Sequence, residues 1–149
     1  MNKIRILTPF LLLFFSIAGT AQSQNTSKTS IYRRFNINAS EMDRDVDKGI
    51  AFLRGNVSID FDGKKLRCEN ADIFEKQQRI VAEKNVVLES AKFQIHGEKV
   101  EYDYKSNLGT IYKGSVQSGK VIFEGDKIEK TGDNDFKTAE GKYTACDCL

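Results

Sequence analysis

The chain repeats itself with a period of about 29 residues. Three segments share a pattern of a small residue, an acid, Lys or Asn, an aliphatic residue and another acid: "RCENADI" at 67–73, "HGEKVEY" at 96–102 and "EGDKIEK" at 124–130. A second pattern recurs with nearly the same period in "RGNV" from 54, "EKNV" from 83, "KGSV" from 113 and "EGKY" from 140. Two patterns that agree on one period predict a repeat fold, in which each unit buries its apolar face only against its neighbours.

Each repeat reads as two β-strands. The run "NVSIDF" places Val57, Ile59 and Phe61 on one side of the chain, and turn sequences such as "FDGKK" separate such runs. Alternation with a period of two, together with β-branched and aromatic residues, is typical of antiparallel strands, and no helical stripe is sustained. We therefore predict an all-β fold.

The apolar side of the chain switches within each repeat. Leu66 gives way to Ala71, and Ile95 gives way to Val100. One extra residue has to be accommodated at the small-residue position each time, which is how a β-bulge appears in a sequence. We expect the sheet to bend at the same level in every repeat and to fold over an apolar inner face.

The first residues predict export. Lys3 and Arg5 precede an apolar run over residues 6–18, which is shorter than the roughly 20 residues of a membrane-spanning helix. We predict a signal peptide over residues 1–21, a flexible leader over 22–35 and one folded domain over 36–149. Without the signal peptide the chain has 21 basic and 21 acidic residues, so its charge gives no support for nucleic-acid binding.

No group of residues indicates catalysis, a metal or a cofactor. His96 is the only histidine, and no Ser or Cys nucleophile motif accompanies it. Asp43, Asp45 and Asp47 are spaced as in a calcium loop, but Lys48 stands where that loop needs glycine, so a solvated turn is the simpler interpretation. We expect a protein that is not an enzyme.

Three cysteines in an exported chain leave at least one without a partner in the chain. Cys68 reads as a small buried thiol. A disulfide between Cys146 and Cys148 would close a strained ring, and a metal site formed with Cys68 lacks further ligands at standard spacing. In an oxidising compartment, pairing of Cys146 and Cys148 with cysteines outside this chain is the remaining possibility.

The repeat resembles a known family. "A-x-x-x-G-N-V", a short hairpin and a "G-E-K-V" return strand are similar to the OstA-like domain of the lipopolysaccharide-transport family, over residues 36–148. The ending "GKYTACD" resembles the "Y-T-x-C-D" stretch that closes the periplasmic domain of the LptD-type members. The resemblance implies an antiparallel β-jellyroll, a periplasmic location associated with the outer membrane, and a role as a bridge or carrier that binds lipopolysaccharide.

The resemblance also implies roles for particular residues. The apolar inner face would hold the acyl chains of lipid A, and its candidate residues are Val57, Ile59, Phe61, Leu88, Phe93, Ile95, Val100, Tyr102, Val116 and Ile128. Cations at the rim would meet the phosphates, and these are Lys64, Lys65, Arg67 and Lys92. Like domains would join end to end by strand pairing, and Cys146 and Cys148 would pair with the outer-membrane β-barrel portion of the same polypeptide.

Three alternatives stay open from the sequence. The chain is either the periplasmic part of an LptD-type translocon or a free-standing LptA-like protein, since no barrel follows and residues 141–143 begin a repeat that has no return strand. A β-solenoid scaffold with a closed core and no lipid is the competing interpretation. A metal- or redox-active domain that uses the cysteines is the third.

Overall fold

A computed structural model describes residues 35–145, and they form one folded-over antiparallel sheet of ten strands. The strands are β1 (Asn36–Asn38), β2 (Glu41–Asp45), β3 (Ile50–Phe61), β4 (Lys64–Phe74), β5 (Arg79–Glu89), β6 (Phe93–Asp103), β7 (Leu108–Ser118), β8 (Val121–Lys130), β9 (Phe136–Thr138) and β10 (Gly141–Ala145). The all-β prediction is confirmed. No helix that could span a membrane occurs in this range.

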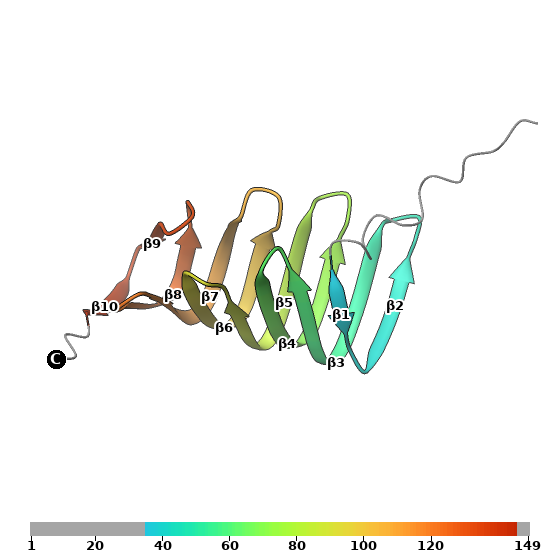
Figure 1. Cartoon of the computed structure of the whole chain (residues 1–149), viewed down its shortest axis with the longest axis horizontal. Coiled ribbons are helices and arrows are strands. Elements are labelled where there is room, and N and C mark those ends of the chain that lie inside the picture. The colour runs from blue at the N-terminus through green and yellow to red at the C-terminus, as the bar shows by residue number, and fades with distance from the viewer. Residues whose placement is uncertain (1–34, 146–149) are drawn as a thin grey trace, which may run out of the picture.

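The strands stack along the long axis in chain order, from β1 and β2 at one end to β9 and β10 at the other (Figure 1). Each of β3 to β8 pairs with its neighbours in the sequence, so the sheet is a series of hairpins. The turn at Asp62 and Gly63 has φ values of 45° and 70°, as a two-residue type I′ turn requires. Local hairpins of this kind account for the predicted two-strand repeat.

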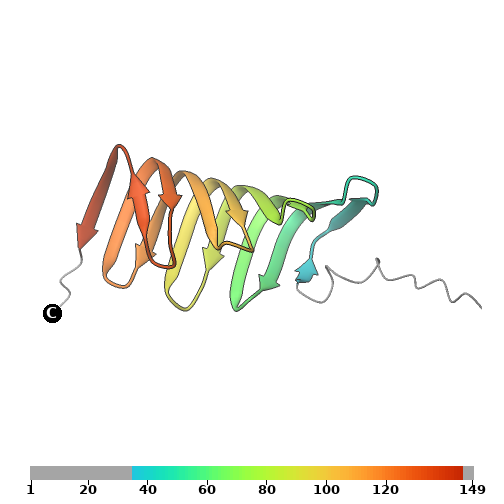
Figure 2. The same ribbon diagram turned by 90° about the horizontal axis from the view of Figure 1, so that it is seen from above.

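Each long strand contributes to two arms of the sheet, one on each side of the bend (Figure 2). The first arm consists of β1, residues 57–68, 86–97 and 114–125, and β10; the second consists of β2, residues 50–54, 70–83, 99–112 and 127–130, and β9. The apolar cluster contains residues of both arms and therefore lies between them.

The bend has a local cause in β3 and β5. Gly55 and Asn56 in β3, and Lys84 and Asn85 in β5, have positive φ values, a conformation that favours Gly and Asn. The register shifts at these positions, and the extra residue lies on β3 and β5. These are the "GN" and "KN" positions of the second sequence pattern.

The bulge prediction was therefore only partly right. The inward side does switch between Cys68 and Ala71 in β4, as expected. The extra residue, however, belongs to β3 and β5 and not to the small-residue position of the strands that follow them. Beyond β6 the register runs through the bend without a shift, because Gly97 of β6 pairs with Gly114 of β7, and Gly114 pairs with Gly125 of β8.

Candidate functional site

The ten apolar candidates lie together in one cluster between the arms. Each exposes at most 7% of its surface. In the first arm, Leu88 pairs with Leu66 on one side and with Ile95 on the other, and the ladder continues through Val116 to Phe123. Side chains that alternate with exposed residues on each strand thus form one continuous apolar interior.

Sequence reasoning left out members of the second arm. Leu53, Ile80 and Ile111 are fully or almost fully buried in the same cluster. These three residues could have been predicted by following the alternation along β3, β5 and β7. Each lies two residues from another inward-facing residue or from the bend. The interior is therefore larger than the candidate set.

Aromatic side chains fill one end of the interior. The ring of Phe61 in the first arm lies 5.9 Å from that of Tyr102 in the second, and Phe35 contacts Phe61 and Tyr104 at 5.5 and 5.0 Å. Tyr102 donates a hydrogen bond to Oδ1 of Asn107 at 3.0 Å. Burial, with a smaller contribution from Asp62, raises the pKa of Tyr102 well above its usual range. This end is held closed by contacts between arms.

A second aromatic group lies at the other end. Phe93 in the first arm contacts Phe136 of β9 at 5.8 Å, and Phe123 contacts Phe136 at 6.4 Å. Lys130 is only 3% exposed, and its Nζ lies 5.3 Å from the Phe93 ring centroid and 5.8 Å from that of Phe136. This ammonium group donates a hydrogen bond to the carbonyl oxygen of Gly132. A buried lysine between two rings is a cation–π arrangement.

The pKa of Lys130 is lowered, chiefly because burial removes water from the ammonium group. The positive charges of Lys64 and Lys92 act in the same direction, whereas Asp133 and Asp135 act against it. Sequence reasoning missed Lys130. Its place two residues after Ile128 on β8 puts it on the inward side, which was the available signal.

Between these two aromatic groups, a pocket of about 310 Å³ opens among the turns at the tips of the two arms, away from the bend, and we call it the mouth pocket. Its walls come from the turns after β3 and β5, from the β6–β7 turn and from the segment after β8. Its lining includes the core side chains Phe93 and Tyr102, together with Lys64, Lys92 and Lys130. The mouth pocket thus joins the apolar interior to a cationic surface.

The four predicted rim cations do not share one position. Lys64 and Lys92 line the mouth pocket. Lys65 and Arg67 lie on the outward side of β4, where Lys65 forms an ion pair with Asp60 at 3.6 Å and Arg67 forms one with Glu89 at 2.7 Å. The mouth therefore has a different cationic set from the predicted one: Lys64, Lys92 and Lys130.

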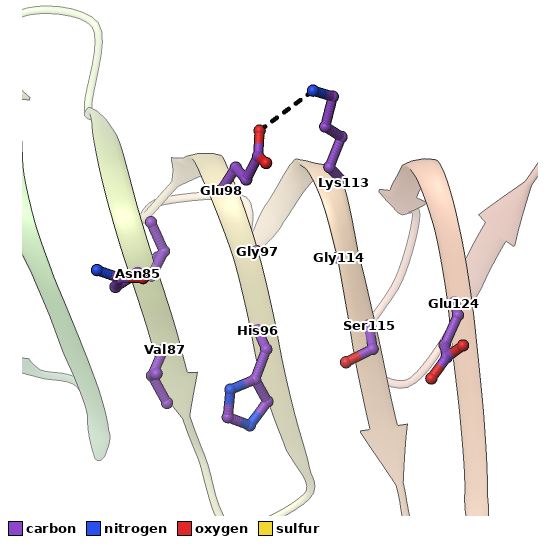
Figure 3. Close-up of a pocket in the computed structure, with 10 residues that line it drawn as sticks. Asn85, Val87, His96, Gly97, Glu98, Lys113, Gly114, Ser115 and Glu124 are labelled. Atoms are coloured by element: carbon purple, nitrogen blue, oxygen red, sulfur yellow. Dashed lines mark ion pairs between the residues drawn. The ribbon is translucent and has the colours of Figure 1, made fainter.

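A hollow of about 560 Å³ lies on the outer face of the bend (Figure 3). Gly97 and Gly114 pair there, beside His96 and Ser115. An ion pair of 3.4 Å between Glu98 and Lys113 borders it. Within residues 35–145, no group of three or more His, Cys, Asp or Glu side chains is placed to hold a metal ion.

The remaining single residues have local explanations. Burial raises the pKa of the Cys68 thiol to about 12, so this thiol is unreactive in the folded protein. Asp45 accepts a hydrogen bond from the Lys48 amide and forms an ion pair with the same lysine at 3.0 Å, as in an ordinary turn. Cys146 and Cys148, and the predicted signal peptide, lie outside the described residues.

Both ends of the described sheet present strand edges. β1 and β2 pair with the two halves of β3, and β9 and β10 pair with the two halves of β8. Within the described residues these four short strands have no partner on their other side. Tyr143 of β10 is 77% exposed. Edges of this kind are surfaces to which another strand can add.

Comparisons with known proteins bear on this architecture. A family model described as "LptA/(LptD N-terminal domain) LPS transport protein" matches residues 36–136. No curated protein matches the chain. The crystal structure of LptH, the LptA-homologous periplasmic component of the lipopolysaccharide transport device of Pseudomonas aeruginosa, is similar with a TM-score of 0.69. That match has 15% sequence identity and covers 75% of this chain and 94% of LptH, so it establishes the fold.

Proposed function

The chain belongs to the family of LptA and LptD N-terminal-domain LPS transport proteins, and on this premise we propose that it is a periplasmic bridge module that binds lipopolysaccharide without catalysing a reaction. The proposed ligand part is the acyl chains of lipid A. The proposed location, associated with the outer membrane, follows from the predicted signal peptide and from the family.

The continuous apolar interior is the observation that carries this proposal. Acyl chains need non-directional apolar contact, worth about 25 cal/mol for each Å² buried. The ladder from Ile59 through Leu88 to Phe123 runs along the long axis and crosses every repeat of the first arm. A chain lying along this ladder would contact the same kind of surface in each repeat, which suits passage from one end to the other.

The strand edges support end-to-end assembly. The outer side of β10 offers backbone donors and acceptors at one end, and β1 and β2 offer them at the other. Addition of a strand from a like domain would satisfy these groups and extend the interior across the junction. In this proposal, the partners are other OstA-like Lpt proteins.

The LptD-type assignment rests on the "YTACD" segment. In this proposal, Cys146 and Cys148 form disulfides with cysteines of an outer-membrane barrel portion, which would anchor the bridge. Non-reducing peptide mapping of the protein from the envelope of expressing cells would detect these bonds. Recovery of both thiols in the free form would count against the LptD-type assignment and leave the LptA-like one.

A structural scaffold with a closed core is the second candidate. The near-complete burial of all ten candidates and the aromatic contacts between arms favour it. In that case the interior would be ordinary packing and would admit no lipid.

Photocrosslinking separates the two candidates. A photoreactive amino acid at Ile95, which is fully buried in the interior, is expected to form adducts with labelled lipopolysaccharide in cells that export the chain. The matched control is Gln94, the next residue of β6, which points to the outer side. Adducts at position 95 and none at 94 support transport through the interior. No adduct at either position, with normal adducts at an established bridge protein in the same cells, would leave the scaffold.

A further inference from the structure

We propose that the mouth pocket binds a phosphate group of an amphiphile, through Lys64, Lys92 and Lys130, while the apolar chains of the same molecule enter the interior. This inference rests on the proposed function for the chains. The headgroup site itself depends only on the pocket and its charges.

These lysines come from two strands and one turn that lie far apart in the sequence. Lys64 begins β4, Lys92 lies in the β5–β6 turn and Lys130 ends β8. All three line the same pocket. Their mutual repulsion is evident at Lys130, whose pKa is lowered by burial and also by the charges of Lys64 and Lys92. Like charges held together are destabilising without an anion, and a bound anion would relieve the repulsion.

Most cations elsewhere in the described residues are paired, and the three mouth lysines differ from the other unpaired ones in lining one pocket together. Ten other Lys and Arg side chains form ion pairs with carboxylates, including Lys65 and Arg67, which flank Leu66 on the same strand as Lys64. Within residues 35–145, none of the three mouth lysines forms an ion pair; Lys64 donates only a long hydrogen bond, 3.4 Å, to a backbone carbonyl oxygen. Lys130 donates a hydrogen bond to the carbonyl oxygen of Gly132, and none of the three is neutralised by a carboxylate of the described residues within ion-pair distance.

The acids of the pocket do not cancel this charge. Asp62 and Asp133 also line it, which gives three ammonium groups and two carboxylates in the lining, while Asp135 acts on Lys130 from outside the lining. Asp133 raises the pKa of Lys130 and so helps to keep it protonated. Phosphate oxygens accept charge-assisted hydrogen bonds from ammonium groups, and lysine is a common phosphate ligand in proteins.

The size of the pocket decides which part of an amphiphile it takes. A volume of about 310 Å³ is at the lower end for small-molecule sites, enough for a phosphorylated sugar but not for several acyl chains. Phe93 and Tyr102 belong both to the pocket wall and to the core cluster. A headgroup in the pocket would therefore have its chains directed to the interior between the tips of the arms.

Binding of two forms of one lipid tests the site. The exported chain, purified from the periplasm of expressing cells, would be titrated with lipid A that carries both phosphates and with the same lipid A after enzymatic dephosphorylation. We expect at least tenfold tighter binding of the phosphorylated form, about 1.4 kcal/mol. In the double variant Lys64→Gln/Lys92→Gln most of this preference should be lost, because only Lys130 remains, and the variant should still bind the dephosphorylated form. Lys130 is left intact because it is buried.

The matched control is Lys65→Gln/Arg67→Gln, which removes the same charge from the outward side of β4 and should keep the preference. If both double variants lose the preference for phosphorylated lipid A equally, the preference comes from long-range electrostatics, and the proposed site is wrong. Retention of the preference in Lys64→Gln/Lys92→Gln would overturn it as well. Thermal unfolding of each variant checks that the fold is retained.

Failure of the proposed function gives a different result. If the wild-type chain binds neither form of lipid A, the carrier role is wrong, and titration with inorganic phosphate then tests the site alone. Changes in the NMR signals of the Lys64, Lys92 and Lys130 side chains would support a site for soluble phosphate. No change at these signals would overturn the site.

Discussion

Leu88→Ala should destabilise the protein by about 3 kcal/mol. Leu88 is fully buried, and its register partners Leu66 and Ile95 are held in place by the backbone hydrogen bonds of three strands, so they cannot close the space. The substitution removes three carbon atoms, which loses about 2.4 kcal/mol of transfer free energy at about 0.8 kcal/mol each. The remaining cavity adds to this, within a usual range of about 2–5 kcal/mol. Equilibrium urea unfolding, followed by circular dichroism, measures the change.

The neighbouring residue of β5 supplies the control. Val87 lies on the outward side, beside the hollow of the bend, and Val87→Ala should change the free energy of unfolding by less than about 1 kcal/mol. Equal effects of the two substitutions would refute the reasoning, because they would mean that the interior is not closely packed in solution. The denaturant dependence should be unchanged in both variants, since a change in it would indicate an altered native or unfolded state.

Three further predictions follow from single features of the structure. Burial raises the pKa of Cys68 to about 12 in the folded state, against 9.0 in the unfolded state, so the thiol ionises first in the unfolded chain. The free energy of unfolding should therefore fall above pH 9, by about 3 kcal/mol at pH 11. Cys68→Ala should remove this part of the loss, as measured by urea unfolding at alkaline pH. Gly114→Ala should lower the free energy of unfolding by about 3 kcal/mol, because its new Cβ would overlap the carbonyl oxygen of His96. Gly63→Ala has free space and should lower it by only about 1 kcal/mol, because of the positive φ. Similar melting temperatures of the two variants would contradict this. The arms can be linked across the mouth pocket by a short, reductant-cleavable bismaleimide between Asp62→Cys and Asp133→Cys, in a chain without the native cysteines. The link should block lipid uptake until it is cleaved. Uptake by the linked protein would show that the arms need not separate.

Most of the fold could be predicted because it depends on residues that are close together in the sequence. Val57, Ile59 and Phe61 alternate along a single strand, and Asn56 or Asn85 marks a backbone conformation that depends on one residue and its neighbours. The position of the extra residue could not be predicted in the same way. It depends on which residues of adjacent strands pair, and the parity of one strand does not determine this.

The candidate site was less predictable, for a physical reason that Lys130 illustrates. Its parity on β8 indicates the inward side, but lysine is rarely buried, and only the approach of Phe93 and Phe136 from other strands makes burial tolerable. Lys65 shows the opposite error. The sequence places it at the rim of the interior, but in the structure it points outward and forms an ion pair with Asp60. Charges around a site depend on tertiary partners, whereas the alternation that forms a core does not.

A filled interior is compatible with a carrier because of how the arms are held together. The backbone hydrogen bonds of residues 35–145 run from strand to strand within each arm, and away from the bend none joins one arm to the other. Separating the arms would therefore break side-chain contacts, such as those of Phe61 with Tyr102 and Phe93 with Phe136, without breaking a strand ladder. An acyl chain that replaces these contacts restores a similar apolar area at a similar free energy per Å². The side chains that close the core in the free protein are then the same ones that would line the path of a lipid, and the unpaired cations at the mouth are placed where such a molecule would leave its headgroup.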